Sequence, residues 1–247
     1  WDDVPEPVRV SIRRVFGEDL APSRAVARVL DDVAQRGDAA LGEWTARIEG
    51  LTLERFEVER GSWEAAYRSL SADLAQALEI AAERIRAFHE RQPVASWTTE
   101  ALGGHLGQRV VPLARVGIYV PGGSAPLPSS LLMTAIPARV AGVREVIVCS
   151  PPQRESGRVS EVILAAAHLA GVDRLFALGG AQAIAALAFG TESVPRVDKI
   201  AGAGGLFTTL AKRQLYGLVG LDGIYGPTET VVVADESANP AWVAADL

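Results

Sequence analysis

The fold is decided by the stretch Gly117–Ala138, which reads GIYVPGGSAPLPSSLLMTAIPA. It continues a short apolar, β-branched run, Val116–Val120, into the glycine-rich turn Pro121-Gly122-Gly123-Ser124 and then into a segment expected to be helical from about Ser130. A buried strand, a glycine-rich turn and a helix in this order make up the first half of a βαβ unit. The prolines within the stretch would break a membrane-spanning helix, so we expect no membrane partner.

The same pattern recurs downstream at intervals close to the ~30 residues that one βαβ unit needs. Further strands are expected at Glu145–Cys149, Arg174–Leu178 and Val197–Ala201. The helices that follow them are expected from about Ser160, Ala181 and Leu206. The sequence therefore predicts an α/β fold with a parallel sheet.

The chain before this region has the pattern of helices. Ser23 and Asp38 are expected to cap helices that end at Gly37 and near Gly50, and Ser71 a longer one that reaches about Glu90. Residues 92–108 lose the helical period and gather glycine and proline, which makes them the expected domain boundary. After the sheet, a strand is expected at Thr230–Ala234, followed by a helix capped by Asn239 with Pro240 at its first position.

The composition narrows the classes of partner. The chain has 247 residues, of which 49% are hydrophobic, and 24 Lys and Arg stand against 30 Asp and Glu for a net charge of −6. An acidic chain without a basic block argues against nucleic acid and against an anionic membrane surface. The single cysteine, Cys149, lies in an apolar run, so we expect a buried thiol in a reducing, cytoplasmic setting. No targeting peptide is expected at the N-terminus.

Three expected strands run into glycine-rich turns, namely Pro121-Gly122-Gly123-Ser124, Gly179-Gly180-Ala181-Gln182 and Gly202-Ala203-Gly204-Gly205. In a parallel sheet all three lie at the carboxyl edge, where open α/β folds bind ligands at helix N-termini. For one turn alone, backbone geometry is the simpler explanation, but three at one edge favour an anionic ligand. None has the glycine spacing of the standard dinucleotide fingerprint.

The other chemical side chains give weaker signals. Lys199 and Lys212 flank the third turn; we expect Lys199 to pair with Asp198 at the surface and Lys212 to lie on a solvated helix face. The three histidines, His89, His105 and His168, have no partner at the spacing of metal ligands. No serine has the flanking glycines of a nucleophile elbow. The residues themselves therefore predict neither a metal site nor a catalytic nucleophile.

Three segments carry a family resemblance: Gly117–Ala138, quoted above, GGAQAIAALAFGTESVPRVDKI at Gly179–Ile200, and GPTETVVVAD at Gly226–Asp235. They resemble histidinol dehydrogenase, and weaker similarity in RGDAAL and ERIRAFHERQ extends the resemblance over nearly the whole chain.

The resemblance implies an NAD-dependent enzyme, with zinc in the intact family, that oxidises an amino alcohol such as L-histidinol through the aldehyde to the carboxylic acid. It implies that Tyr119 and Gln182 contact NAD. It also implies a homodimer and a Rossmann-like cofactor domain at 109–227. Residues 1–108 would form the N-terminal helical region of a second, incomplete α/β domain, and residues 228–247 would return into it.

Two positions depart from the family pattern. Where the family usually has G-P-G-N, with an asparagine at the cofactor, this chain has Gly202-Ala203-Gly204-Gly205, so Gly205 lacks the amide. The substrate-side serine of the family is Thr228 here, which keeps the hydroxyl but adds a methyl group. These departures suggest a paralogue that acts on a related alcohol.

The family's metal ligands and its Glu-His base pair follow the equivalent of Asp246-Leu247. We therefore expect the chain as given to hold no metal and to be inactive, as the N-terminal portion or a truncated relative of such an enzyme. The alternative hypothesis is a noncatalytic nucleotide-binding or assembly module that lost the metal site.

Overall fold

The computed structural model describes residues 4–92, 95–122, 126–224 and 231–246. The helices are α1 (Glu6–Phe16), α2 (Pro22–Arg36), α3 (Asp38–Glu49), α4 (Gly61–Ser69), α5 (Ala72–His89), α6 (Pro128–Val140), α7 (Glu161–Ala170), α8 (Gly180–Phe189), α9 (Leu206–Leu215) and α10 (Pro240–Asp246). The strands are β1 (Trp97–Thr99), β2 (Leu106–Gln108), β3 (Arg115–Tyr119), β4 (Glu145–Ser150), β5 (Arg174–Ala177), β6 (Lys199–Ala201) and β7 (Gly220–Leu221).

The centre of the molecule is a parallel sheet with the strand order β5-β4-β3-β6-β7. Strands β3 to β6 confirm the strands expected from the sequence, whereas the short edge strand β7 was not predicted. Chain order runs outward from β3 to β5 and then returns to the other side of β3 with β6. This is the order of a doubly wound, Rossmann-like sheet, in which ligands bind beside the point where the direction reverses.

Both faces of the sheet are buried, as parallel sheets require. Along β3, Ile118 belongs to one hydrophobic core and its neighbour Tyr119 to the other. In β4, Val148 and Cys149 alternate in the same way. Cys149 is a buried free thiol, as expected, and burial raises its pKa, so the thiol is not a ready nucleophile.

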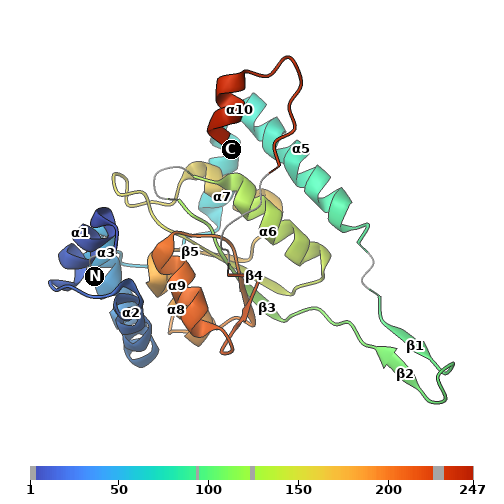
Figure 1. The fold of residues 1–247 in the computed structure, drawn as a ribbon, viewed down its shortest axis with the longest axis horizontal. Helices are drawn as coiled ribbons and strands as arrows, with labels where there is room; N and C mark the ends of the chain where they lie inside the picture. The colour runs from blue at the N-terminus through green and yellow to red at the C-terminus, as the bar shows by residue number, and fades with distance from the viewer. Residues whose placement is uncertain (1–3, 93–94, 123–125, 225–230, 247) are drawn as a thin grey trace.

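The N-terminal helices supply much of the covering for both faces. Helices α2 and α3 pack on α8, while α4 and α5 pack on α6 and α7 (Figure 1). The segment between α3 and α4 also protects the sheet edge, because the N–H of Val58 donates to Leu175 and the N–H of Ala177 donates to Phe56, each at 2.8 Å. The helical region therefore shares both cores with the sheet. Its assignment to a separate domain ending at residue 108 stays a prediction.

The helix ends test the expected caps. The Ser71 hydroxyl accepts from the N–H of Leu74, and the side chain of Asn239 accepts from the N–H of Ala241 at 2.9 Å, so both caps are confirmed. The prediction for Asp38 was wrong, because Asp38 is the first residue of α3, whose N-cap is Gly37, and no side chain caps this helix. The prediction for Ser23 was also wrong, because α2 begins at Pro22 and Ser23 lies inside the helix. A proline at the first position has no N–H to leave unpaired, so this helix starts without a side-chain cap.

Two further segments differ from expectation. Residues 92–108 contain an antiparallel ribbon, β1 and β2, which extends away from the sheet and exposes Trp97 and Leu106 (Figure 1). The strand expected at Thr230–Ala234 was wrong for its described part, since residues 231–234 are not in a strand and Val231 and Val233 are highly exposed. A run of valines makes a strand only where a neighbouring strand pairs with it, and none does so in the described chain. No helix in the described ranges is both long and apolar enough to cross a membrane.

Candidate functional site at the carboxyl edge of the sheet

The candidate site lies where β3 and β6 end side by side. Parallel pairing brings Ile118 of β3 opposite Ala201 of β6, so the chain leaves both strands at the same edge of the sheet. We call these points the strand exits. The exits from β4 and β5 lie at that edge too, since both strands run parallel to β3. All three glycine-rich turns therefore begin at one edge, as the sequence predicted; residues 123–125 of the first lie outside the described residues.

Gly202 brings the β3 and β6 exits into direct backbone contact. Its φ of 110° is one that residues with a side chain rarely adopt, and a Cβ there would collide with the carbonyl oxygen of Tyr119. Only glycine fits this position. The two strand ends therefore meet here through backbone atoms alone.

Tyr119 joins the first and second turns. Its hydroxyl accepts a hydrogen bond of 3.2 Å from the backbone N–H of Gly180, the first residue of α8. Its side chain is buried, and this burial raises the pKa of Tyr119, an effect partly offset by hydrogen bonds with Thr208 and Gly180. The ring is therefore a fixed, neutral wall with its hydroxyl at the N-terminus of α8.

Gln182, the second residue implied to contact NAD, lies in the first turn of α8 and is completely buried. Neither its Nε2 nor its Oε1 has a hydrogen-bond partner among the described residues, and the buried hydroxyl of Ser150 at the end of β4 has none either. A buried polar group without a partner costs about 1–3 kcal/mol. These orphaned groups at the carboxyl edge fit a site completed by a ligand with donors and acceptors.

The third turn ends in an open position. Gly205 is the N-cap of α9 with extended backbone, and a Cβ built on it meets nothing within 4 Å. At its neighbour Gly204, a Cβ would approach the side chain of Thr208 to 2.6 Å. Gly205 therefore has room for a side chain, and Gly204 does not.

The prediction that Lys212 lies on a solvated helix face was wrong. Its side chain is only 3% exposed and lies beneath the third turn, where Nζ donates to the carbonyl oxygen of Gly202 at 2.9 Å and pairs with Asp222 at 2.5 Å. Burial of a lysine needs a partner that a one-dimensional pattern does not show. Lys199 also differs from expectation, because Asp198 accepts from the N–H of Arg115 and makes no ion pair with Lys199 in the described chain.

A carboxylate from the N-terminal region reaches the same edge. Glu49 ends α3, and its Oε1 lies 2.7 Å from where a Cβ on Gly179 would be. Burial raises the pKa of Glu49, while Arg154 and Arg14 partly offset this effect. The sequence did not predict a half-buried carboxylate beside the N-terminus of α8, because the local sequence does not indicate that α3 ends over the sheet.

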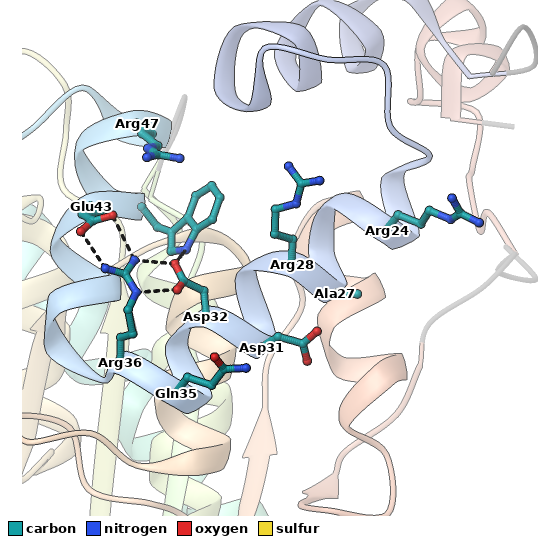
Figure 2. Close-up of a pocket in the computed structure, with 10 residues that line it drawn as sticks. Arg24, Ala27, Arg28, Asp31, Asp32, Gln35, Arg36, Glu43 and Arg47 are labelled. Carbon is teal, nitrogen blue, oxygen red and sulfur yellow. Dashed lines mark hydrogen bonds and ion pairs between the residues drawn. The ribbon is translucent and has the colours of Figure 1, made fainter.

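Two hollows lie near these elements. A small apolar cavity of about 80 Å³ is bounded by α1, α2, Gly180 and Phe207 at the site. A larger open cleft of about 580 Å³ lies over α2 and α3 (Figure 2). There Arg36 bridges Asp32 and Glu43, so much of the charge in the cleft is neutralised internally. The glycine-rich edge, with its orphaned polar groups, is the better candidate.

The remaining expected site residues are not placed. Thr228 lies outside the described residues. The described ranges contain no group of three His, Cys, Asp or Glu side chains that would hold a metal. Their residues therefore do not fit a zinc site, and we derive no chemical step through a metal.

Comparisons with known proteins agree with the resemblance. A family profile described as histidinol dehydrogenase matches residues 16–247. Histidinol dehydrogenase from Deinococcus radiodurans is 52% identical over 244 residues, which are 99% of this chain and 55% of the relative. That from Thermus thermophilus is 52% identical over 235 residues, covering 95% of this chain and 55% of the relative.

The solved structures agree as well. The crystal structure of histidinol dehydrogenase from Elizabethkingia anophelis matches with a TM-score of 0.83 at 36% identity, covering 98% of this chain and 57% of that one. The chain spans about half the length of the curated relatives it matches.

Proposed function

Because this chain belongs to the histidinol dehydrogenase family, we propose that it forms the NAD-binding part of an oxidoreductase that oxidises an amino alcohol, L-histidinol or a related compound, to the carboxylic acid. NAD, when bound, would supply the hydride acceptor: one molecule for the oxidation of the alcohol to the aldehyde, and a second for the oxidation of the aldehyde and water to the acid. The proposal includes a cytoplasmic role in histidine biosynthesis. Zinc is proposed from the family alone.

The observation that carries the proposal is the meeting of Tyr119, Gly180 and Gly202 at the point where the strand order reverses. Helices α8 and α9 begin on the two sides of this contact, and their first N–H groups would favour the negative charge of a pyrophosphate. The orphaned amide of Gln182 would offer a donor and an acceptor to a bound nicotinamide or ribose.

The chain's own residues would position the cofactor and keep water from it. Tyr119 fixes the exit of β3, and its buried, neutral ring gives the cofactor an apolar wall. The apolar cavity next to Gly180 is lined by Phe16, Ile48 and Phe207, side chains that exclude water from the α8 N-terminus. Substrate contacts would come from Thr228.

Titration of the protein, at its natural length, with NAD tests the proposal. Saturable binding of NAD in a calorimeter, followed by NADH formation when histidinol and zinc are added, is expected. Absence of saturable NAD binding would contradict the cofactor assignment. NADH formation with other amino alcohols but not histidinol would move the substrate to a related alcohol.

The alternative is a noncatalytic nucleotide-binding or assembly module. It is favoured by Gly205, which leaves the N-cap of α9 without the amide that the family pattern carries there. The same titration separates the two hypotheses, because a binding module gives saturable NAD binding but no NADH with any amino alcohol tested.

We also propose that the protein is a homodimer. The projecting β1–β2 ribbon exposes apolar side chains, and Trp97, Leu102 and Leu106 are each at least half exposed. Exposed apolar groups of this kind favour contact with another protein surface. Light scattering during size-exclusion chromatography tests this, and a monomer at micromolar concentration would contradict it.

A further inference from the structure

The side chains of Lys212 and Asp222 meet beneath the third glycine-rich turn, and together they hold both backbone polar groups of Gly202. Lys212 Nζ donates to the Gly202 carbonyl oxygen at 2.9 Å, and Asp222 Oδ2 accepts from the Gly202 N–H at 2.8 Å. Asp222 Oδ1 pairs with Lys212 and also accepts from the N–H of Gly223. One ion pair thus fixes the two peptide units that flank the Cα of Gly202.

Gly202, whose backbone it fixes, lies at the reversal point of the sheet. The β6–β7 ladder ends when the N–H of Asp222 donates to the carbonyl of Ile200, and the chain then leaves the sheet at Gly202. Past the end of a ladder, buried N–H and C=O groups need new partners. The pair supplies them at the residue that also touches the Tyr119 carbonyl.

The stability of the fold alone does not require the Lys212–Asp222 ion pair. Removing two charges from water is costly, and replacing a buried ion pair with apolar side chains of similar volume is often neutral or stabilising. Lys212 is 3% and Asp222 19% exposed, so much of this cost applies here. A role for the pair other than stability is therefore worth testing.

We propose that Lys212 and Asp222 are positioning residues that hold the Gly202–Gly205 turn in the conformation that receives the cofactor's pyrophosphate. The inference rests on the proposed NAD-binding function and deepens it. Neither side chain needs to contact the cofactor. They act through the backbone N–H and C=O of Gly202, and in this way set the direction of the N-terminus of α9.

The opposite edge of the same sheet provides a matched control. There Arg139 pairs with Asp173, Asp173 accepts from the N–H of Val146 at 2.7 Å, and Arg139 donates to the Gly171 carbonyl. The two pairs are built alike: in each, the carboxylate accepts from a backbone N–H and the cation donates to a backbone carbonyl oxygen. The Arg139–Asp173 pair lies at the amino ends of β4 and β5, away from the glycine-rich turns.

The test compares K212M, the double variant K212M/D222N, and the control R139M in the protein at its natural length. Three quantities are measured: the thermal midpoint, the NAD dissociation constant by calorimetry, and amide hydrogen exchange at residues 202–205. The double variant is included because K212M alone leaves a buried carboxylate unpaired and is expected to be the least stable.

We expect the double variant to melt closer to wild type than K212M does, yet to bind NAD about tenfold more weakly than wild type and to exchange the 202–205 amides faster without ligand. R139M should lower the thermal midpoint and leave NAD affinity within about twofold of wild type.

The inference is overturned if the double variant binds NAD as tightly as wild type, or if R139M weakens NAD binding to the same degree. If wild type itself shows no saturable NAD binding, the proposed function fails and this inference fails with it. Faster exchange at 202–205 in that case would still identify the pair as the anchor of the turn.

Discussion

The hydroxyl of Tyr119, at the end of β3, accepts a hydrogen bond from the backbone N–H of Gly180, at the start of α8, across 61 positions of sequence. This contact joins the first two glycine-rich turns and places a phenol at a helix N-terminus, where anions bind. The geometry of the candidate site depends on such links between strand exits more than on any one motif.

Replacing this phenol tests its role directly. Y119F should destabilise the fold by about 1 kcal/mol, because the partly buried Gly180 N–H loses its acceptor, and should weaken NAD binding several-fold. Thermal unfolding and calorimetric titration measure the two effects. NAD affinity equal to that of wild type would rule out Tyr119 as a cofactor contact.

Gly205 is a position where the site can be improved. In G205N the new side chain would project into open space at the N-cap of α9, a position that favours asparagine. We expect tighter NAD binding and a gain in stability of a few tenths of a kcal/mol. G204N is the control, since its Cβ would clash with Thr208 and destabilise the protein. Weaker NAD binding by G205N would show that the open space belongs to the ligand.

Gln182 is expected to lower the stability of the ligand-free protein and to strengthen NAD binding. Methionine has a similar size but no polar group without a partner, so Q182M should stabilise the ligand-free protein by about 1 kcal/mol and weaken NAD binding. T45V is the matched control: it removes the unpartnered buried hydroxyl of Thr45 on α3 and should leave NAD affinity unchanged. If Q182M instead destabilises the ligand-free protein, the amide already has a partner such as a buried water.

Glu49 makes stability depend on pH. Because burial holds its pKa above the ordinary 4.5, the folded state binds more protons than the unfolded state just above that value. The contribution of Glu49 to stability therefore becomes less favourable as pH rises from 4.5 through its folded-state pKa. E49Q should be more stable than wild type at neutral pH and lose this dependence in thermal melts.

Glu43, on the same helix as Glu49, makes stability depend on pH in the opposite direction. Arg36 holds the pKa of Glu43 below the ordinary 4.5, so its contribution is present above that pH and is lost as pH falls through the lowered value. E43Q should therefore be slightly less stable than wild type at neutral pH.

Equal pH profiles for E49Q and wild type would mean that Glu49 is solvated in solution.

The sequence predicted the sheet because its strands are short apolar runs that end in glycine, a local pattern of burial. The Val116–Val120 run is an example, and β3 forms at Arg115–Tyr119. Lys212 was predicted to be solvated because its burial depends on Asp222, ten positions away on another element. The strand expected at Thr230–Ala234 shows the same limit, since a run of valines does not supply a pairing partner.

A crystal structure of the protein soaked with NAD tests the central claim most directly. The account predicts the pyrophosphate in the crevice between β3 and β6, within hydrogen-bond distance of backbone N–H groups of the second or third glycine-rich turn. A nucleotide bound elsewhere, for example in the arginine-lined cleft over α2 and α3, would contradict it.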